Sequence, residues 1–470
     1  MPALVAHGNI QRAPETLPIE FVVVGGGVAG FTSAIALSRV GHKVTILEQR
    51  DDFQETILAG GCRFAPNTTR IFYRWGLEEE LRKISIWARY VQFSRYESGE
   101  VVAKGEWVHD FKVESDGEFI QMQYGAFRKL LYETALKYGV TVRANSKVTS
   151  VNIKPEAPSV TLESGEEIVA DVIIGADGCH SLSRQVMFGE QDYMKRKNIV
   201  MYNTVVPVEK MAAVPELVPY LERDKVGMVV SWFGDRYGVM GFPSTEIKRV
   251  QQGDVYNLHV YTPETTPMPI PVSEVDSAHL VQAMNGCDPH LRKMAELATQ
   301  IYAVPIVERP HLDDWLHEDG PFLAIGEAAH PLSSGSIYAL SLAAADGMML
   351  GRLFYHLRRK DQIPVFLAAL SEMRHKRVQE VWDVQSTNPA AMSMPPGVEH
   401  SEGLAAAEAM GDGRALTMTQ DAIRAVFAYD PEDEADNWLV QWGLMRERTQ
   451  SEAPLTFAVA IAHQNEQTEG

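Results

Sequence analysis

The stretch Phe21–Gly30, FVVVGGGVAG, decides the fold of this chain. Its apolar start, with three consecutive β-branched valines, predicts a buried parallel strand. The chain then turns at three glycines and enters an apolar run with helical periodicity, Val28–Val40. In this order of elements, free N–H groups and the positive end of the helix dipole face an anionic group such as a pyrophosphate.

The glycines of the turn have the spacing Gly25-x-Gly27-x-x-Gly30. The first allows a tight turn, the second lets the backbone approach a pyrophosphate, and the third lets helix and strand pack closely. A second strand, Lys43–Leu47, leads to Glu48, an acid about 20 residues on that can bind a ribose hydroxyl. Together these features predict a dinucleotide site, the alternative being a glycine-rich turn without a ligand.

Composition limits the remaining possibilities. The 470 residues are 45% hydrophobic and 22% charged, which is ordinary for a globular protein of two or three domain-sized units. A formal net charge of −19 argues against nucleic acid or an anionic membrane as a partner. The cysteines Cys62, Cys179 and Cys287 lie far apart and form no metal-binding spacing, so we expect reduced thiols, a cytoplasmic location and no metal.

The start of the chain and an apolar run near its end bear on membrane targeting. Met1–Leu17 lacks a charged segment followed by an apolar core and is expected to be a flexible arm without a signal peptide. Leu455–Ala462 is apolar but far too short to cross a bilayer. We therefore expect no stable membrane insertion.

Two later strands also end in glycine and an acid. Val172–Ala176 runs into Asp177-Gly178, and Phe322–Ile325 runs into the stretch Gly326–Pro331, GEAAHP. The carboxyl ends of strands in an open α/β sheet present ligand-binding groups. The alternative for Asp177 is a helix N-cap.

The segments between these motifs suggest a second domain. Short alternating stretches between Arg89 and Phe119 predict a small inserted antiparallel sheet, and strand-like segments without helices follow Asn198. Their aromatic residues suit a flat apolar ligand and a domain core equally well. The predicted organisation is a flexible arm (1–17), a dinucleotide-binding domain in three parts (18–88, 121–190, 301–360), an inserted β segment (89–120), a β-sheet substrate domain (191–300) and a C-terminal helical region (361–470).

Read together, the motifs resemble those of the single-component, group A FAD-dependent monooxygenases, typified by para-hydroxybenzoate and salicylate hydroxylases. The likeness covers roughly Ile19 to Tyr355. It implies an α/β fold: a Rossmann-like FAD-binding domain of the GR2 type, an inserted β-sheet substrate domain and a C-terminal helical region. It also implies bound FAD and a transient NADPH or NADH.

The resemblance assigns contacts residue by residue. The glycine loop would hold the FAD pyrophosphate, Glu48 the adenosine ribose and Glu327, in place of the family's aspartate, the ribityl chain. Arg128, in the first turn of a predicted helix Gln123–Tyr138, would contact the ribityl-phosphate region, the alternative being a solvated arginine. The residues expected at the cofactor are Gly25, Gly27, Val28, Ala29, Gly30, Glu48, Gly61, Cys62, Arg128, Asp177, Gly178, Gly326, Glu327, Gly335 and Ser336.

One stretch departs from the family pattern. Where the family carries a glutamine–glycine pair against the flavin pyrimidine, this chain has Tyr338-Ala339, and Gly335 and Ser336 would have to supply the loop. The GEAAHP motif with this loop resembles fungal secondary-metabolism members that oxidise the indole ring of alkaloids.

The activity implied by the resemblance is oxygen transfer from a flavin C4a-hydroperoxide to an electron-rich aromatic ring, using NAD(P)H and O2. The expected reaction is indole 2,3-epoxidation or hydroxylation in alkaloid biosynthesis. The alternatives are a phenol or salicylate-type hydroxylase, or a FAD-retaining scaffold or cyclase without oxygen transfer. No catalytic side chain is assigned, and the residues expected to line the substrate are Arg196, Tyr202, Trp232, Phe233 and Tyr237.

Two groups of polar residues are expected to be structural. His330, beside Pro331, is expected to fix its loop by a hydrogen bond, and His180 and His259 are interpreted in the same way. The acidic run Asp430–Asp436 is expected to be the solvated start of a helix.

Overall fold

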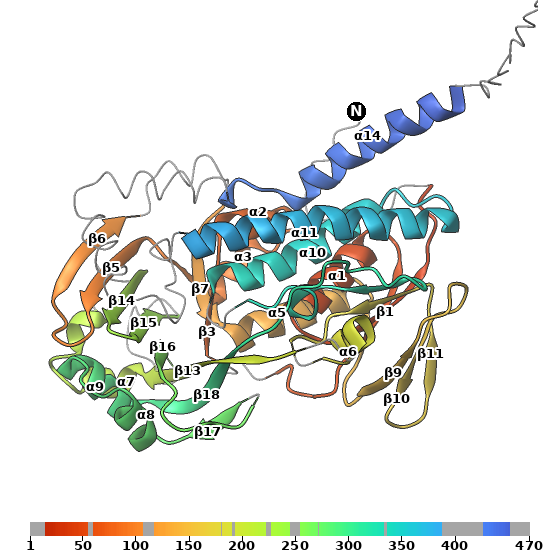
Figure 1. The fold of residues 1–470 in the computed structure, drawn as a ribbon. Helices are drawn as coiled ribbons and strands as arrows, with labels where there is room; N and C mark the ends of the chain where they lie inside the picture. The colour runs from red at the N-terminus through yellow and green to blue at the C-terminus, as the bar shows by residue number, and fades with distance from the viewer. Residues whose placement is uncertain are drawn as a thin grey trace, which may run out of the picture.

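The computed structural model describes residues 15–54, 60–106, 117–179, 181–189, 193–221, 227–244, 254–270, 272–332, 336–387 and 426–451. Figure 1 shows a large β-sheet at one end of the molecule and a parallel sheet with its helices at the other. None of the helices in these ranges is both long and apolar enough to cross a membrane.

The parallel sheet is built around the strand that the first glycine motif follows. Its strand order is β19 (Phe322–Ala324), β12 (Val172–Gly175), β1 (Glu20–Val24), β2 (Lys43–Leu47) and β8 (Thr141–Arg143). All four neighbouring pairs are parallel, with Phe21 opposite both Val172 and Val44. The carboxyl ends of four of these strands therefore bring Gly25, Glu48, Asp177 and Gly326 to one edge, as the sequence predicts.

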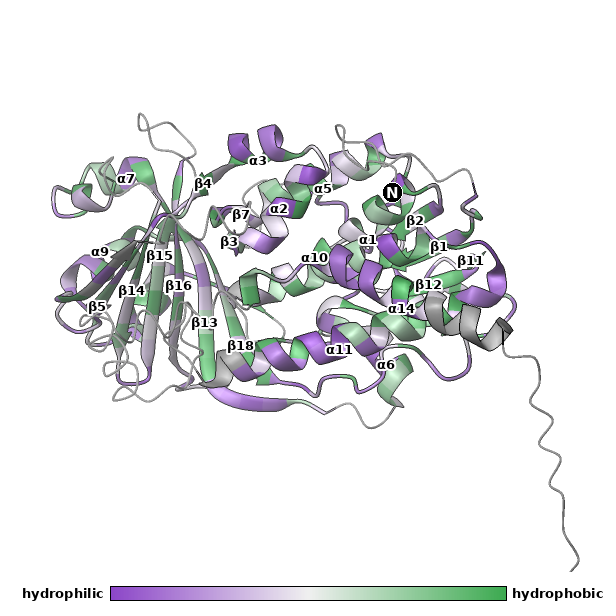
Figure 2. Ribbon diagram, turned by 90° about the horizontal axis from the view of Figure 1, so that it is seen from above, coloured by the Kyte–Doolittle hydropathy of each residue, from purple (hydrophilic) through white to green (hydrophobic). Residues whose placement is uncertain are grey.

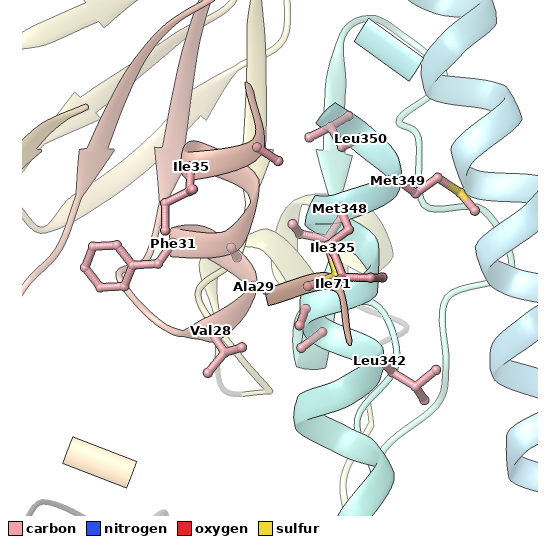
Figure 3. Close-up of a cluster of buried hydrophobic side chains, with 14 of the residues drawn as sticks. Val28, Ala29, Phe31, Ile35, Ile71, Ile325, Leu342, Met348, Met349 and Leu350 are labelled. Carbon is pink, nitrogen blue, oxygen red and sulfur yellow. The ribbon is translucent and has the colours of Figure 1, made fainter. Parts of the chain in front are cut away.

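Two helices pack closely beside this sheet. Helix α1 (Val28–Arg39) lies against α10 (Ile337–Phe354), and Figure 3 shows their apolar side chains together. Small residues permit the approach, because a Cβ added to Gly347 would lie 2.4 Å from the backbone nitrogen of Ser33. Helix α5 (Tyr124–Lys137) also contacts α1, and α11 (Ile363–Thr387) contacts α10. In Figure 2, α10 is more hydrophobic than the outlying helix α3 (Glu78–Ile84), as its interior position requires.

Within the described residues, the large sheet has eight strands. Their order is β17 (Ser273–Val275), β18 (Thr299–Glu308), β13 (Lys195–Pro207), β16 (Val255–Pro263), β15 (Tyr237–Pro243), β14 (Met228–Gly234), β5 (Tyr90–Arg95) and β6 (Val101–Glu106). Segment 89–120 was expected to form a sheet of its own, but β5 pairs in parallel with β14 and so extends the substrate sheet. This sheet also continues past residue 300, through β18.

The large sheet has two different faces. One face packs its apolar residues against three short helices, α7 (Val208–Ala212), α8 (Ser277–Ala283) and α9 (Pro289–Leu297). The other face turns toward the parallel-sheet domain, where Phe242 and Met240 join its core. A side chain on these strands therefore faces either the helices or the cofactor domain, depending on its place in the alternation.

Smaller elements complete the described chain. One three-stranded sheet has the strand order β3 (Gly61–Phe64), β7 (Ile120–Gln123), β4 (Ser85–Trp87). Another has the strand order β11 (Glu167–Val169), β10 (Ser159–Leu162), β9 (Val148–Asn152). Helix α2 (Pro66–Arg74) begins at the predicted proline, and α6 (Leu182–Phe188) follows the second motif. Short 3₁₀ turns occur at Val218–Tyr220, Gly326–Ala328 and Lys360–Gln362.

At both ends of the described chain, residues that were expected to be solvated or flexible are packed against the protein. Helix α14 (Pro431–Ser451) begins within the acidic run Asp430–Asp436. Asp430 is buried, however, and forms ion pairs with Arg70 at 3.2 Å and Arg74 at 2.8 Å. The start of this helix is thus docked rather than solvated. At the other end, Thr16 is buried and its hydroxyl donates to the Tyr355 carbonyl at 2.7 Å, so the described end of segment 1–17 is docked and not a flexible arm.

Candidate active site

A cavity of about 830 Å³ opens at the edge where the parallel strands end. All three glycine motifs contribute to it, and so does the large sheet. Its lining includes Gly25–Ala29, Glu48, Asp52, Tyr124, Arg128, Asp177, Gly178, Ser181, Glu327, Ala339, Leu340 and Ala343 from one side and Asn203, Val272, Tyr302 and Val304 from the other.

The glycine loop forms an uncapped helix start inside this cavity. Gly27 is the N-cap of α1, with no side-chain cap and no acidic residue in the first turn. The backbone at Gly25 has φ +107°, and a Cβ there would lie 2.4 Å from the Ala176 carbonyl oxygen, so only glycine fits. A Cβ at Gly27 would meet nothing within 4 Å, which means that its surface is open to the cavity. Uncapped N–H groups at such a helix end suit an anionic ligand.

Glu48 and Arg128 lie together beside this loop. Glu48 Oε2 accepts the Gly26 N–H at 2.8 Å, and Arg128 Nε donates to the Gly26 carbonyl at the same distance. The Arg128 guanidinium also pairs with Asp52 and lies 3.5 Å from Glu48 Oε2. Arg128 is thus buried and holds both the glycine loop and its acid, so the alternative of a solvated arginine is wrong.

The second motif forms a short helix start. Asp177 Oδ2 accepts the Ser183 N–H at 3.1 Å, while Oδ1 has no hydrogen-bond partner. Burial raises the pKa of this carboxyl. Ser181 caps α6 by accepting the Arg184 N–H, and the buried Arg184 side chain donates to the carbonyls of Ala328 and Pro310. Arg184 therefore ties the second motif to the third and does not line the cavity.

A buried ionic network holds the third motif, Gly326–Pro331, in place. Asp346 Oδ2 accepts the Gly326 N–H at 2.8 Å and His330 Nε2 at 2.7 Å, and Arg374 Nε donates to its Oδ1 at 2.8 Å. Burial by itself would raise the pKa of Asp346, but the charges of His330 and Arg374 outweigh it and lower this pKa. His330 thus has the structural role that was expected of it.

Glu327 projects from this fixed loop into the cavity. Its side chain is exposed to the cavity, and desolvation by the protein around it raises the pKa of the carboxyl. Gly326 has φ +61°, and a Cβ there would lie 2.8 Å from the Ala29 Cβ, so glycine lets the loop approach the start of α1.

The chain between Gly60 and Cys62 lies directly on the large sheet. A Cβ at Gly60 would lie 2.0 Å from Asn203 Oδ1, and one at Gly61 would lie 2.6 Å from Asn257 Cγ. His259 Nε2 lies 3.1 Å from the Gly61 carbonyl, to which it donates. This contact agrees with the structural role expected of His259, but its Nδ1 has no hydrogen-bond partner.

Most of the residues expected to line the substrate lie elsewhere. Tyr202, Trp232 and Tyr237 pack on the sheet face that meets α7–α9, so their assignment is wrong. For Tyr202 the error is one of alternation, because its neighbour Asn203 in the same strand lines the cavity instead. Arg196 pairs with Glu264 at 2.6 Å, and Phe233 stacks on Phe93 with ring centroids 5.6 Å apart, so neither lines the cavity.

Sequence reasoning missed several cavity residues, among them Tyr124, Asn203, Tyr302 and Val304. Asn203 is next to Tyr202 in β13. Strand alternation would have predicted that Asn203 lines the cavity, once it was known which face of the sheet turns toward the cofactor domain. Of the other candidates, Ser336 caps α10 by accepting the Tyr338 N–H at 3.2 Å. Gly335 and His180 lie outside the described residues. Among the residues that are described, no group of histidine, cysteine and carboxylate side chains could hold a metal.

Comparisons with known proteins agree with this geometry. Residues 19–385 match the family described as FAD binding domain. A FAD-dependent monooxygenase, OpS4, of Beauveria bassiana is 26% identical over 366 residues, covering 77% of this chain and 83% of the relative. The 3-hydroxybenzoate 6-hydroxylase of Klebsiella oxytoca is 24% identical, covering 70% and 78%.

Solved structures show the same fold. The crystal structure of native FqzB has a TM-score of 0.73 at 21% identity, covering 95% of this chain and 97% of that one. A salicylate hydroxylase substrate complex has a TM-score of 0.68 at 16% identity, covering 89% and 97%. The α/β fold, the FAD cofactor and the class of FAD-dependent monooxygenase are thereby confirmed as expected. The chain belongs to the FAD binding domain family.

Proposed function

We propose that this protein uses NAD(P)H and O2 to insert one oxygen atom into an electron-rich aromatic ring. One observation carries the proposal: a single cavity is lined both by the loops that suit FAD and by the large sheet. Gly26 and Glu327 reach it from the loops, and Asn203 and Tyr302 reach it from the sheet. A ring bound between them would lie beside the cofactor and away from water.

The residues present fit FAD. The open surface of Gly27 and the uncapped start of α1 would hold the pyrophosphate, Glu48 the adenosine ribose and Glu327 the ribityl chain. Bound FAD would supply the redox chemistry and the activation of O2. The chain itself binds, orients and shields the reacting groups, and no side chain is assigned as a base.

Two classes of ring are candidates for the substrate. Polar groups on the inward face of the sheet, including Asn203 and His259, favour a phenol, which can both donate and accept hydrogen bonds. An indole, oxidised at its 2,3-bond in alkaloid biosynthesis, is the second candidate. It is supported by fungal relatives such as the asperlicin C monooxygenase of Petromyces alliaceus, which is 25% identical and covers 77% of this chain and 78% of the relative.

Flavin reduction tests the proposal directly. The FAD-loaded protein is mixed anaerobically with NADPH or NADH, with and without a panel of phenols and indoles, and the loss of oxidised flavin absorbance is followed. We expect one ring class to accelerate reduction strongly. FAD that stays oxidised with both nicotinamides and every ring would favour the scaffold or cyclase alternative instead.

A further inference from the structure

Arginines from two helices hold the chain just before helix α14. From α11, Arg374 Nη1 donates to the Tyr429 hydroxyl at 2.9 Å, and Arg377 Nη2 donates to the Val426 carbonyl at 2.7 Å. The guanidinium carbons of these two arginines lie 5.5 Å and 4.3 Å from the centre of the Tyr429 ring. From α2, Arg70 Nη2 donates to the Tyr429 carbonyl at 3.4 Å. Tyr429 is thus anchored to the body of the protein, whereas α14 projects past α10 and α11 (Figure 1).

The Tyr429 hydroxyl joins two charged side chains. It accepts a hydrogen bond from Arg374 and donates one to Glu434 Oε2 in the first turn of α14. Burial raises the pKa of Tyr429, so the hydroxyl keeps the proton that it donates. Burial alone would lower the pKa of Arg374, but Tyr429 and Asp346 outweigh it and raise this pKa. Arg374 therefore stays charged and needs its acceptors.

The same arginine also reaches the third motif. Arg374 Nε donates to Asp346 Oδ1 at 2.8 Å, and both side chains are fully buried. Asp346 Oδ2 in turn accepts the Gly326 N–H and His330 Nε2. Glu327 follows Gly326 and lines the cavity. One line of hydrogen bonds therefore runs from the first turn of α14 to the loop that presents Glu327 to the cofactor site.

We propose that Tyr429 is a positioning residue that couples the docking of α14 to the binding of FAD. Through Arg374 it keeps Asp346 fixed on the Gly326 N–H, and so keeps the cavity loop in shape for the cofactor. Removing the hydroxyl leaves a buried Arg374 N–H without its acceptor, and a guanidinium that turns to another acceptor no longer fixes Asp346. Coupling between two sites is reciprocal, so bound FAD should also hold the start of α14 in place.

Hydrogen exchange of the wild-type full chain tests this reciprocity without any substitution. Amide exchange is followed by mass spectrometry in the FAD-free and the FAD-loaded protein. We expect FAD to slow exchange in α14 about fivefold or more, which is the usual size of coupling between two sites. Helix α9, packed on the face of the large sheet away from the cofactor domain, is the control and should change much less. Unchanged exchange in α14, or equal slowing in both helices, would overturn the proposal.

Two matched substitutions test the route through Tyr429. Tyr429→Phe should raise the Kd for FAD about fivefold or more, as measured by flavin fluorescence titration, and should abolish the FAD-dependent slowing in α14. Asp436→Asn weakens a different contact of the same helix, a pair with Arg352 at 2.7 Å that lies outside the line of bonds to Asp346. This control should leave the Kd for FAD within about twofold of the wild-type value.

A double variant separates the line of hydrogen bonds from a local packing effect. In Arg374→Met the hydroxyl has no route to Asp346, so adding Tyr429→Phe should weaken FAD binding no further. Melting temperatures check the fold of each variant, and the wild-type exchange experiment decides the proposal if a variant does not fold. Wild-type FAD affinity in Tyr429→Phe, a further loss in the double variant, or an equal loss in Asp436→Asn would overturn it.

This inference goes beyond the proposed reaction, because it concerns FAD binding whether or not oxygen is transferred. None of its readouts uses a substrate or a nicotinamide. Failure of the coupling would therefore leave the proposed oxygen transfer standing, and failure of oxygen transfer would leave the coupling standing.

Discussion

Replacing Asp346 by asparagine tests the buried network that fixes the third motif. Asp346 and Arg374 are both 0% exposed, and Asp346 accepts three hydrogen bonds, from Gly326, His330 and Arg374. Asparagine has the same shape but no charge, and its amide would face at least one of these donors. Breaking a buried ion pair from one side costs about 3–5 kcal/mol, because the remaining charge stays buried without its counterion. Whole domains are stable by only about 5–15 kcal/mol, so this loss would be severe.

Urea unfolding of the FAD-free protein measures the effect, and Arg374→Met together with the double variant completes a thermodynamic cycle. We expect the double variant to lose at least about 1 kcal/mol less than the sum of the two single losses, since removing both charges leaves neither buried alone. FAD should also bind more weakly to Asp346→Asn, because the Gly326 N–H loses its acceptor. A loss below about 1 kcal/mol for Asp346→Asn, or additive losses in the cycle, would refute the reasoning.

Four further predictions rest on other contacts of the described residues. Gly27→Ala should leave the stability of the FAD-free protein within about 0.5 kcal/mol but weaken FAD binding at least tenfold, about 1.4 kcal/mol, as measured by flavin titration. Gly30→Ala, whose Cβ would lie 2.0 Å from the Gly25 carbonyl oxygen, should instead destabilise the fold itself, and similar behaviour of the two variants would contradict this. Glu48→Ala should lower FAD retention after desalting about tenfold, whereas the exposed Glu20→Ala should not; full retention would count against the ribose contact. Folding lowers the pKa of His259, so as the pH falls the unfolded chain binds a proton at this ring before the folded chain does. His259 should therefore lower the free energy of unfolding by about 2 kcal/mol between pH 7 and pH 5. His259→Gln should remove that part of the pH dependence, and an unchanged profile would show that the ring is not buried in its neutral form. Asp430 is a buried acid paired with two arginines, whereas the Asp436 side chain is 41% exposed. Asp430→Asn should therefore lower the melting temperature clearly more than Asp436→Asn. Equal shifts would support the original expectation of a solvated helix start.

The sequence predicted well which motifs meet at one edge of the parallel sheet, and the reason is physical. Parallel strands of one sheet end at the same edge, so motifs at Gly25, Asp177 and Gly326 had to meet once their strands were recognised. The helix starts at Val28 and Pro66 were equally local signals, set by glycine and proline.

The substrate half depended on long-range information. Alternation along β13 and β14 shows that Tyr202 and Trp232 share faces with particular neighbours, but it does not say which face meets the cofactor domain. Pairing of β5 with β14 joins segments far apart in the chain, and no local pattern specifies it. Asp346 belongs to no motif, so only the folded chain identifies its partners.

The most direct test of the central claim uses labelled oxygen. The FAD-loaded protein, NADPH and the ring compounds that accelerate flavin reduction are incubated under ¹⁸O2, and products are analysed by mass spectrometry. The account predicts one labelled oxygen atom in the ring product for each NADPH consumed, apart from the part lost as hydrogen peroxide. Product without label, or NADPH oxidation that yields only hydrogen peroxide with every accelerating ring, would contradict a monooxygenase built on this cavity.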